Sequence, residues 1–527
     1  MKSIRGSLRS WALVCALAAG AAAAAESIEQ NFARPPDSAR PHTWWHWMNG
    51  NVTREGITAD LEAMARVGVG GAQIFNAAEG IPPGPVAFNS PEWVGLVKHA
   101  AKEARRLGLE LCLHNCAGWS SSGGPWNTPE NGMKVVVTSE RQVRGPSAFA
   151  DALPQPPAKL GFYRDIAVLA FRTPEGERVR MRDAKPSVTL GEARLDGAKA
   201  ADGSPATSVQ LGLPKPKEPV FIQLAFAQPF TARMLTLTPG PGMQGCGGRV
   251  EASDDGLAFR PVETFSVGRG NEVRTFAFKP ATARFFRVLF TSASTKTKRI
   301  AVAEVDLSAK VGVENLAGKI FLDRGGEFRA EAAAEVDAGA VVRGDEIVNL
   351  TAALGADARL AWAVPEGEWT ILRLGYTANG RSNHPAPKEG TGLECDKLSK
   401  EAAQAHWDGH MAKVVAELGK YAGKADAGLN NVLIDSYEVG CQNWTSGFEA
   451  EFRRRSGYDL TPFLPTLTGR VVDSPEKTER FLWDFRRVIA DLFAENYAGQ
   501  FAEMAHRAGL QFSVEPYGNC PSDDLQY

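Results

Sequence analysis

Two parts of the chain, residues 43–115 and 400–515, alternate short apolar runs with amphipathic helical segments. In the first part, helices are expected to begin after Thr53 and after Ser90, because Ser and Thr are favoured N-caps and Pro91 suits a first helical position. The apolar runs predict strands at 43–48, 70–75 and 109–115. Such alternation is typical of a parallel β-sheet covered by helices.

The same alternation returns after residue 400. A helix is expected over 400–422, a second from Ser446, and a long one over 481–508. Strands are expected at 430–435 and 510–515. Five strands predict a (β/α) barrel-type catalytic domain that is incomplete at its C-terminus, since a closed barrel has eight. We therefore expect this chain to be a C-terminally truncated fragment.

Between residues 133 and 395 the helical period largely disappears, and short Val-, Phe- and Thr-rich runs are broken by Gly and Pro. This pattern is typical of β-sandwich domains. The expected fold class is therefore α/β plus all-β, with the barrel-type domain interrupted by a β-sandwich insertion. The predicted boundaries are 26–132 and 396–527 for the two barrel parts and 133–395 for the insertion.

The N-terminus has the pattern of a signal peptide over residues 1–25. Lys2, Arg5 and Arg9 precede an apolar run, and Ala23 and Ala25 form an A-x-A-like cleavage site. Cleavage near Ala25 would release a periplasmic or secreted protein. No other segment is long and apolar enough to predict a membrane span, and a net charge of −2 gives no electrostatic case for nucleic acid.

Polar and aromatic side chains gather where the expected strands end, which is where (β/α) enzymes carry their sites. Indole rings can stack on the C–H faces of a sugar, amides and imidazoles can bind its hydroxyls, and two carboxyl groups can hydrolyse a glycosidic bond. The predicted catalytic residues are Glu438 and Glu515. The predicted substrate-binding residues are Trp45, His46, Asn49, Asn51, His114, Asn115, Trp119, Asp435, Tyr437, Asn443 and Trp444.

Structural roles compete with these assignments. A tryptophan is often part of the core, His114 can be a buried histidine, and Asp435 can cap a turn. His406 and His410 lie four residues apart on an expected helix but lack the glutamate of a zinc-binding HExxH motif.

Long motifs in one order resemble glycoside hydrolase family 106, the α-L-rhamnosidases. They are WWHWMNGNVTREGITADLEAM, GIPPGPVAFNSPEW, LHNCAGWSSSGGPW, LIDSYEVGCQNW and FSVEPYG. The resemblance implies an exported bacterial enzyme that removes terminal α-L-rhamnose from plant glycans with inversion and depends on Ca²⁺, whose ligands we do not assign. It also implies that Glu438, in DSYEVG, is the general acid. Glu515 is the candidate base, although the family has another glutamate-containing stretch beyond the point where this chain stops.

Two other functions remain open from the sequence. The chain could be a non-catalytic carbohydrate-binding protein, or an inactive fragment of such an enzyme. It could also be a retaining glycosidase, in which the two carboxyl groups would lie about 5–5.5 Å apart.

Overall fold

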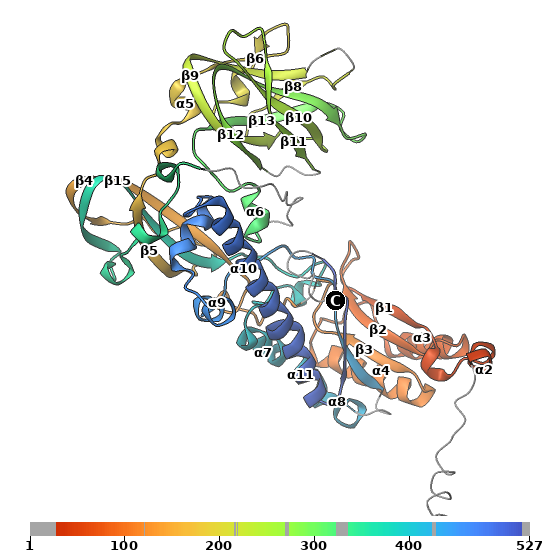
Figure 1. Cartoon of the computed structure of the whole chain (residues 1–527). Coiled ribbons are helices and arrows are strands. Elements are labelled where there is room, and N and C mark those ends of the chain that lie inside the picture. The colour runs from red at the N-terminus through yellow and green to blue at the C-terminus, as the bar shows by residue number, and fades with distance from the viewer. Residues whose placement is uncertain are drawn as a thin grey trace, which may run out of the picture.

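The computed structural model describes residues 28–120, 122–215, 218, 220–268, 273–322, 336–423 and 428–518. The expected signal peptide lies outside these residues. The described strands form three sheets, which are well separated in Figure 1. One sheet is parallel and is built from both ends of the chain, and two are antiparallel and are built from its middle.

The parallel sheet has the order β1-β2-β3-β16-β17, and every neighbouring pair is parallel. All five predicted strands are confirmed. Their bounds are His42–Met48 for β1, Gly71–Ala77 for β2, Glu110–His114 for β3, Leu429–Ile434 for β16 and Gln511–Val514 for β17. Within the described residues the strands form an open run from β1 to β17, so closure into a barrel remains a prediction.

The helices of the first half begin where the sequence predicts. The Thr53 hydroxyl accepts a hydrogen bond from Gly56 N at the start of α3 (Arg54–Arg66), and the Ser90 hydroxyl caps α4 (Pro91–Leu107) in the same way. α4 ends at Gly108, whose φ of 69° is a left-handed conformation that favours glycine.

Alternation along β1 separates two faces of the sheet. Trp45 and Trp47 are buried with the helix-side core, whereas Trp44 and His46 are exposed on the opposite face. Successive side chains of a strand point to opposite faces. The same strand therefore supplies both core and surface aromatics.

The helices of the second half differ from prediction in two places. The expected helix over 400–422 is two helices, α7 (Lys400–Gly409) and α8 (Met411–Leu418), because His410 has φ −133° and ψ −78°. The long helix begins at Pro475, not Phe481, because Ser474 caps it through Lys477 N. It runs through α10 (Pro475–Phe493), a π-helical turn η10 (Ala494–Gly499) and α11 (Gln500–Arg507).

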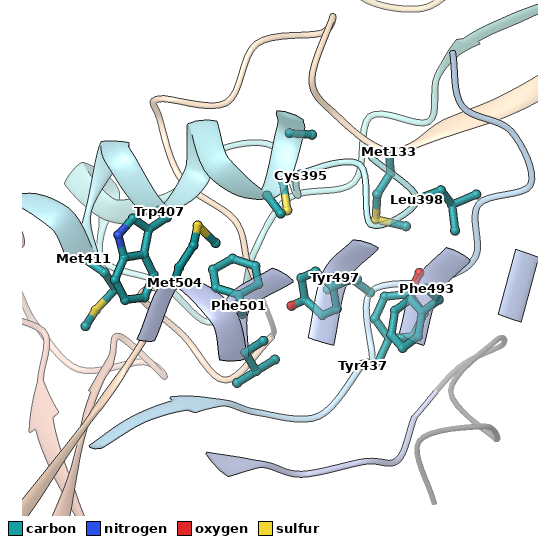
Figure 2. Packing of buried hydrophobic residues seen from close by; sticks show 14 of the residues in the cluster. Met133, Cys395, Leu398, Trp407, Met411, Tyr437, Phe493, Tyr497, Phe501 and Met504 are labelled. Carbon is teal, nitrogen blue, oxygen red and sulfur yellow. The ribbon is translucent and has the colours of Figure 1, made fainter. Parts of the chain in front are cut away.

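This long helix packs its aromatic side chains against the segment that follows β16. Phe493 lies 4.7 Å from Tyr437 between ring centroids, and Tyr497 and Phe501 continue the row, as Figure 2 shows. α9 (Phe448–Ser456) packs beside it, with Phe448 against Phe485. The core under the β16 tip is thus built largely from this helix.

The middle of the chain forms the two antiparallel sheets, which confirms its all-β character. The four-stranded sheet has the order β14-β5-β15-β4, and its core contains Val168, Trp369 and Ile371. The other sheet contains eight strands and encloses a separate core. The bounds are Lys134–Ala152 (β4), Arg164–Arg172 (β5), Val348–Asn349 (β14) and Arg359–Ala378 (β15), then Ser187–Leu190 (β6), Leu195–Asp196 (β7), Val209–Leu211 (β8), Val220–Pro239 (β9), Cys246–Ser253 (β10), Arg260–Val267 (β11), Arg274–Ala293 (β12) and Ile300–Ser308 (β13).

The whole β-rich region enters and leaves the parallel-sheet domain at one neck. β4 pairs with β15 from Lys134↔Ala378 onward, and Asn379 N donates to Met133 O at 2.8 Å. The insertion therefore joins the flanking segments side by side.

None of the helices described is long and apolar enough to cross a membrane. Several short helices complete the described chain. The short helices are α2 (Ile28–Ala33), η1 (Asp37–Ala39), η2 (Glu175–Arg178), α5 (Met181–Ala184), η3 (Ala198–Ala200), α6 (Leu316–Lys319), η4 (Ala338–Ala340), η5 (Gly344–Glu346), η6 (Thr351–Ala353), η7 (Lys388–Gly390), η8 (Gly419–Tyr421) and η9 (Thr461–Thr468).

Candidate active site

Three carboxyl groups meet where β16 and β17 end. Glu515 N donates to Ile434 O at 2.9 Å, and Tyr437 N donates to Tyr517 O at 2.8 Å. These backbone bonds extend the pairing of the two strands past their last ladder residues. Asp435, Glu438 and Glu515 are thereby brought to one edge of the sheet.

Asp435 is the buried member of this group. Burial, a hydrogen bond with Glu515 and the charges of Glu515 and Glu438 together raise the pKa of Asp435 to about 8. Two carboxyl groups that share one site cannot both ionise easily. At neutral pH Asp435 therefore holds its proton.

Glu438 is exposed and lies beside the same pair. Its Oε2 accepts a hydrogen bond from the Ser436 hydroxyl at 3.2 Å, and that hydroxyl also lies 3.5 Å from Trp119 O. Burial raises the pKa of Tyr517, as do the charges of the three carboxyl groups, although a hydrogen bond with Ser436 opposes the rise. Glu438 is thus the carboxyl group most open to a ligand.

Aromatic rings border the carboxyl groups on the β1 to β3 side. The imidazole of His114 stacks on Phe75 with centroids 4.9 Å apart, and His46 lies edge-on to Trp119 at 6.3 Å. Burial lowers the pKa of His114 to about 4, so its ring is neutral and Nε2 accepts from Asp435 N at 3.4 Å. Aromatic rings can stack on the C–H face of a sugar, and the carboxyl groups beside them can reach its polar groups.

Three predicted ligands from the first strand and the loop that follows it have hydrogen-bond partners within the protein. The Trp45 indole is buried and donates to Asp60 Oδ2 at 2.9 Å, on the opposite face of β1 from His46. Asn49 Nδ2 donates to Ile81 O, and Asn51 Nδ2 donates to Pro82 O. Both amides therefore anchor the loop after β2.

The predicted residues Asn115, Asn443 and Trp444 are fully buried. Asn115 Nδ2 donates to the Ser122 hydroxyl. Asn443 Oδ1 accepts a hydrogen bond from Val136 N, and Asn443 Nδ2 donates one to Ile320 O. Trp444 packs on Phe448 at 4.7 Å. These three side chains support the site from the core.

Tyr437 is also buried, between the long helix and a buried ion pair that sequence reasoning missed. Lys397 Nζ lies 2.6 Å from Glu394 Oε2, and both side chains are 0% exposed. Glu394 also accepts from the Ser120 hydroxyl and from Ser122 N, at 2.9 Å each. Burial opposes ionisation of Glu394, but Lys397 and these hydrogen bonds lower its pKa.

A second buried carboxylate in the same segment, Asp396, fixes the chain beyond Glu438. Asp396 pairs with Lys134 at 2.8 Å and accepts from Gln442 Nε2 and the Thr445 hydroxyl. The run Glu394-Cys395-Asp396-Lys397 has no apolar period and reads as a polar loop. Its burial could not be found from sequence, because no local pattern distinguishes it from a solvated loop.

The predicted Ca²⁺ is not matched by a side-chain cluster in the described parts of the chain. There, no three His, Cys, Asp or Glu side chains are arranged so that they could hold a metal ion. We therefore derive no step through a metal.

Residues 33–527 match the family model described as α-L-rhamnosidase, glycoside hydrolase family 106. The chain belongs to this family. It is 33% identical to the rhamnosidase of Novosphingobium sp. PP1Y, whose solved structure superposes with a TM-score of 0.76 over 93% of this chain and 47% of that one. It is also 38% identical to a Formosa agariphila protein named as a β-glucuronidase, over 95% of this chain and 31% of that protein. This family member thus spans about half the length of the solved rhamnosidase and about a third of the curated relative.

Proposed function

We propose that the chain carries the acid and base of an exported glycosidase that removes terminal α-L-rhamnose from plant-type glycans. The observation that supports this most is the group of three carboxyls at the β16 and β17 tips, in which Asp435 is buried and the two glutamates are at least partly exposed. Family membership supports the hydrolytic class. Rhamnose as the sugar is supported by the family description and by the similar solved rhamnosidase.

The proposed reaction uses the two exposed or partly exposed glutamates. Glu438 gives its proton to the glycosidic oxygen as the bond to the anomeric carbon breaks. Glu515 takes a proton from the water whose oxygen attacks that carbon from the opposite side. This is the inverting mechanism, for which the two carboxyls stand about 6.5–9.5 Å apart. Asp435 keeps its proton and donates a hydrogen bond to Glu515, which orients the base.

The parallel sheet is proposed to be part of a (β/α) barrel, and the active protein is proposed to act outside the cytoplasm. Export is supported by the leader pattern before Glu26 and by a disulfide at Cys441, since disulfides persist in oxidising compartments. Dependence on Ca²⁺ is part of the proposal and rests on the family resemblance. A chelator titration with and without added Ca²⁺ tests it.

The first experiment measures release of nitrophenol from an aryl α-L-rhamnoside by the folded chain and by Glu438→Gln. The variant is expected to lose at least about 10³-fold in kcat, because its amide cannot give a proton, while binding of rhamnose stays within a few-fold. Near-normal turnover by the variant would contradict the role of Glu438. The anomer released first, read by NMR, separates inversion from retention.

A second candidate activity is supported by the relative named as a β-glucuronidase. An aryl β-D-glucuronide is therefore assayed beside the rhamnoside under the same conditions. Cleavage of the glucuronide alone would replace rhamnose as the proposed sugar. It would leave the acid and base roles of Glu438 and Glu515 in place.

A further inference from the structure

Ser436 lies between the buried and the exposed carboxyl groups, and its backbone is fixed at the end of β16. Ser436 N donates to Asp435 Oδ1 at 2.7 Å. On its other side, Tyr437 N donates to Tyr517 O at 2.8 Å, and Tyr437 pairs with Gly518 in a parallel β-bridge. Ser436 is therefore held by its neighbours in both directions along the chain.

Alternation along this extended segment places Ser436 and Glu438 on the same side. Tyr437 and Val439 are buried in the helix-side core, whereas Glu438 is exposed. Because successive side chains of an extended chain point to opposite sides, the side chains of residues 436 and 438 lie together on the side of the carboxyl groups. The Ser436 hydroxyl accordingly lies 3.2 Å from Glu438 Oε2.

The Ser436 hydroxyl is itself enclosed, because the residue is only 2% exposed. Its Oγ lies 3.5 Å from Trp119 O, which is the longer of these two contacts with acceptors. Tyr517 also makes a hydrogen bond with Ser436. A hydroxyl has one proton and two lone pairs, so Ser436 can give its proton to Glu438 while it accepts from the Tyr517 phenol.

An exposed glutamate needs such a contact to act as a general acid. Its long side chain samples several rotamers in water, whereas the acid must lie within hydrogen-bond reach of the glycosidic oxygen. A short, buried serine on a fixed backbone restricts the Glu438 carboxyl group before the substrate binds. This lowers the entropic cost of reaching the productive geometry.

The same hydrogen bond favours proton transfer. Because Oε2 accepts from Ser436, Oε1 is the oxygen of Glu438 that carries the acid proton. As this proton passes to the glycosidic oxygen, the bond from that oxygen to the anomeric carbon breaks, and its electron pair stays on the oxygen. Negative charge then develops on the Glu438 carboxyl group, and hydrogen bonds to ionised acceptors are stronger than those to neutral ones. The contact therefore stabilises the transition state more than the ground state.

We propose that Ser436 is a positioning residue that holds the carboxyl group of Glu438 for protonation of the glycosidic oxygen. This inference rests on the proposed function, because Ser436 acts only through Glu438 as the general acid.

The test measures how strongly the rate depends on the leaving group. 2,4-Dinitrophenolate leaves without being protonated, whereas an alcohol needs the acid. Ser436→Ala is expected to lower kcat/KM for methyl α-L-rhamnoside by about 10-fold or more, and for 2,4-dinitrophenyl α-L-rhamnoside by less than about twofold. Ser436→Thr, which keeps a hydroxyl, should recover part of the loss on the methyl glycoside.

Ser253→Ala is the matched control. Ser253 is also buried, and its hydroxyl donates to the Asp255 carboxyl group at 2.9 Å in the eight-stranded sheet. The control variant should change the rate with neither rhamnoside. Equal losses on both rhamnosides in folded Ser436→Ala, or no loss on the methyl glycoside, would overturn the role of Ser436.

Cleavage of neither rhamnoside by the wild type would contradict the proposed function instead. Crystal structures of the wild type and of Ser436→Ala then test this inference separately. A Glu438 carboxyl group that occupies one rotamer in the wild type and several in the variant would support the positioning role. The same rotamers in both proteins would overturn it.

Discussion

The proton on Asp435 couples the charge of the site to the stability of the fold. The pKa of Asp435 rises from an ordinary 3.8 to about 8 on folding. Between these values the folded protein holds a proton that the unfolded chain has released, so this group stabilises the fold fully below about pH 4 and loses that contribution as pH rises to about 8. The free energy of unfolding is therefore expected to fall towards alkaline pH, as far as Asp435 contributes to it.

Asp435→Asn is expected to remove this dependence. Its amide can still donate to Glu515, but it cannot titrate, so the free energy of unfolding should fall less steeply between pH 4 and 8, by up to about 1.4 kcal/mol per pH unit. Urea unfolding at several pH values measures both slopes. Parallel slopes for wild type and variant would contradict the protonated state of Asp435.

At the scale of elements, the segment 394–397 fixes the loop after β16 from below. Glu394 and Lys397 hold the chain near Ser120 and Tyr437, and Asp396 holds Gln442 and Thr445. Taking charged side chains out of water costs free energy, so each charge in the buried pairs Lys397–Glu394 and Lys134–Asp396 depends on its partner. The loop that carries Glu438 thus has a rigid support despite its own exposure.

Lys397→Met is expected to destabilise the protein by about 3–5 kcal/mol, because it leaves the Glu394 carboxylate buried without its cation. The double variant Lys397→Met/Glu394→Gln should recover much of the loss, since no unpaired charge remains. Thermal unfolding of the two variants measures the difference. A double variant as unstable as the single one would mean that the ammonium acts through contacts other than this pair.

Sequence reasoning predicted the strands well because their apolar runs are long and bounded, and it placed Glu438 and Glu515 at a shared edge. It did not predict which polar neighbours face that edge. Trp45 and His46 are adjacent, yet alternation buries one and exposes the other. The start of α10 had the same signal as α4, Ser-Pro-Glu at Ser474, but the apolar period considered began later.

At the scale of the whole molecule, Arg470 joins three parts of the chain. Its guanidinium bonds Glu140 of β4 at 2.5 and 2.8 Å and Glu177 of η2 at 2.7 and 2.8 Å, close to the end of η9. A planar cation with two bidentate carboxylates is a strong and directional link. It ties the four-stranded sheet and η2, which precedes the eight-stranded sheet along the chain, to the domain of the parallel sheet.

Arg470→Met is expected to loosen this junction without unfolding either antiparallel core. Amide hydrogen exchange should accelerate around Glu140 and over η2, while β12 in the eight-stranded sheet keeps its protection. Arg480→Met, which removes an exposed intrahelical pair with Glu476, is the control and should leave all three regions unchanged. Uniform acceleration in β12 as well would show that Arg470 supports the whole fold rather than the junction.

The single neck between Met133 and Asn379 also bears on how the chain is made. The ribosome completes β1, β2 and β3 roughly 300 residues before β16, so at about 5–20 residues per second the edge of β3 waits many seconds without its neighbour. During that interval the eight-stranded sheet, which has a separate core, can fold. Because β15 pairs with β4, the chain that follows β15 starts close to the end of β3. This shortens the search of β16 for its pairing partner β3.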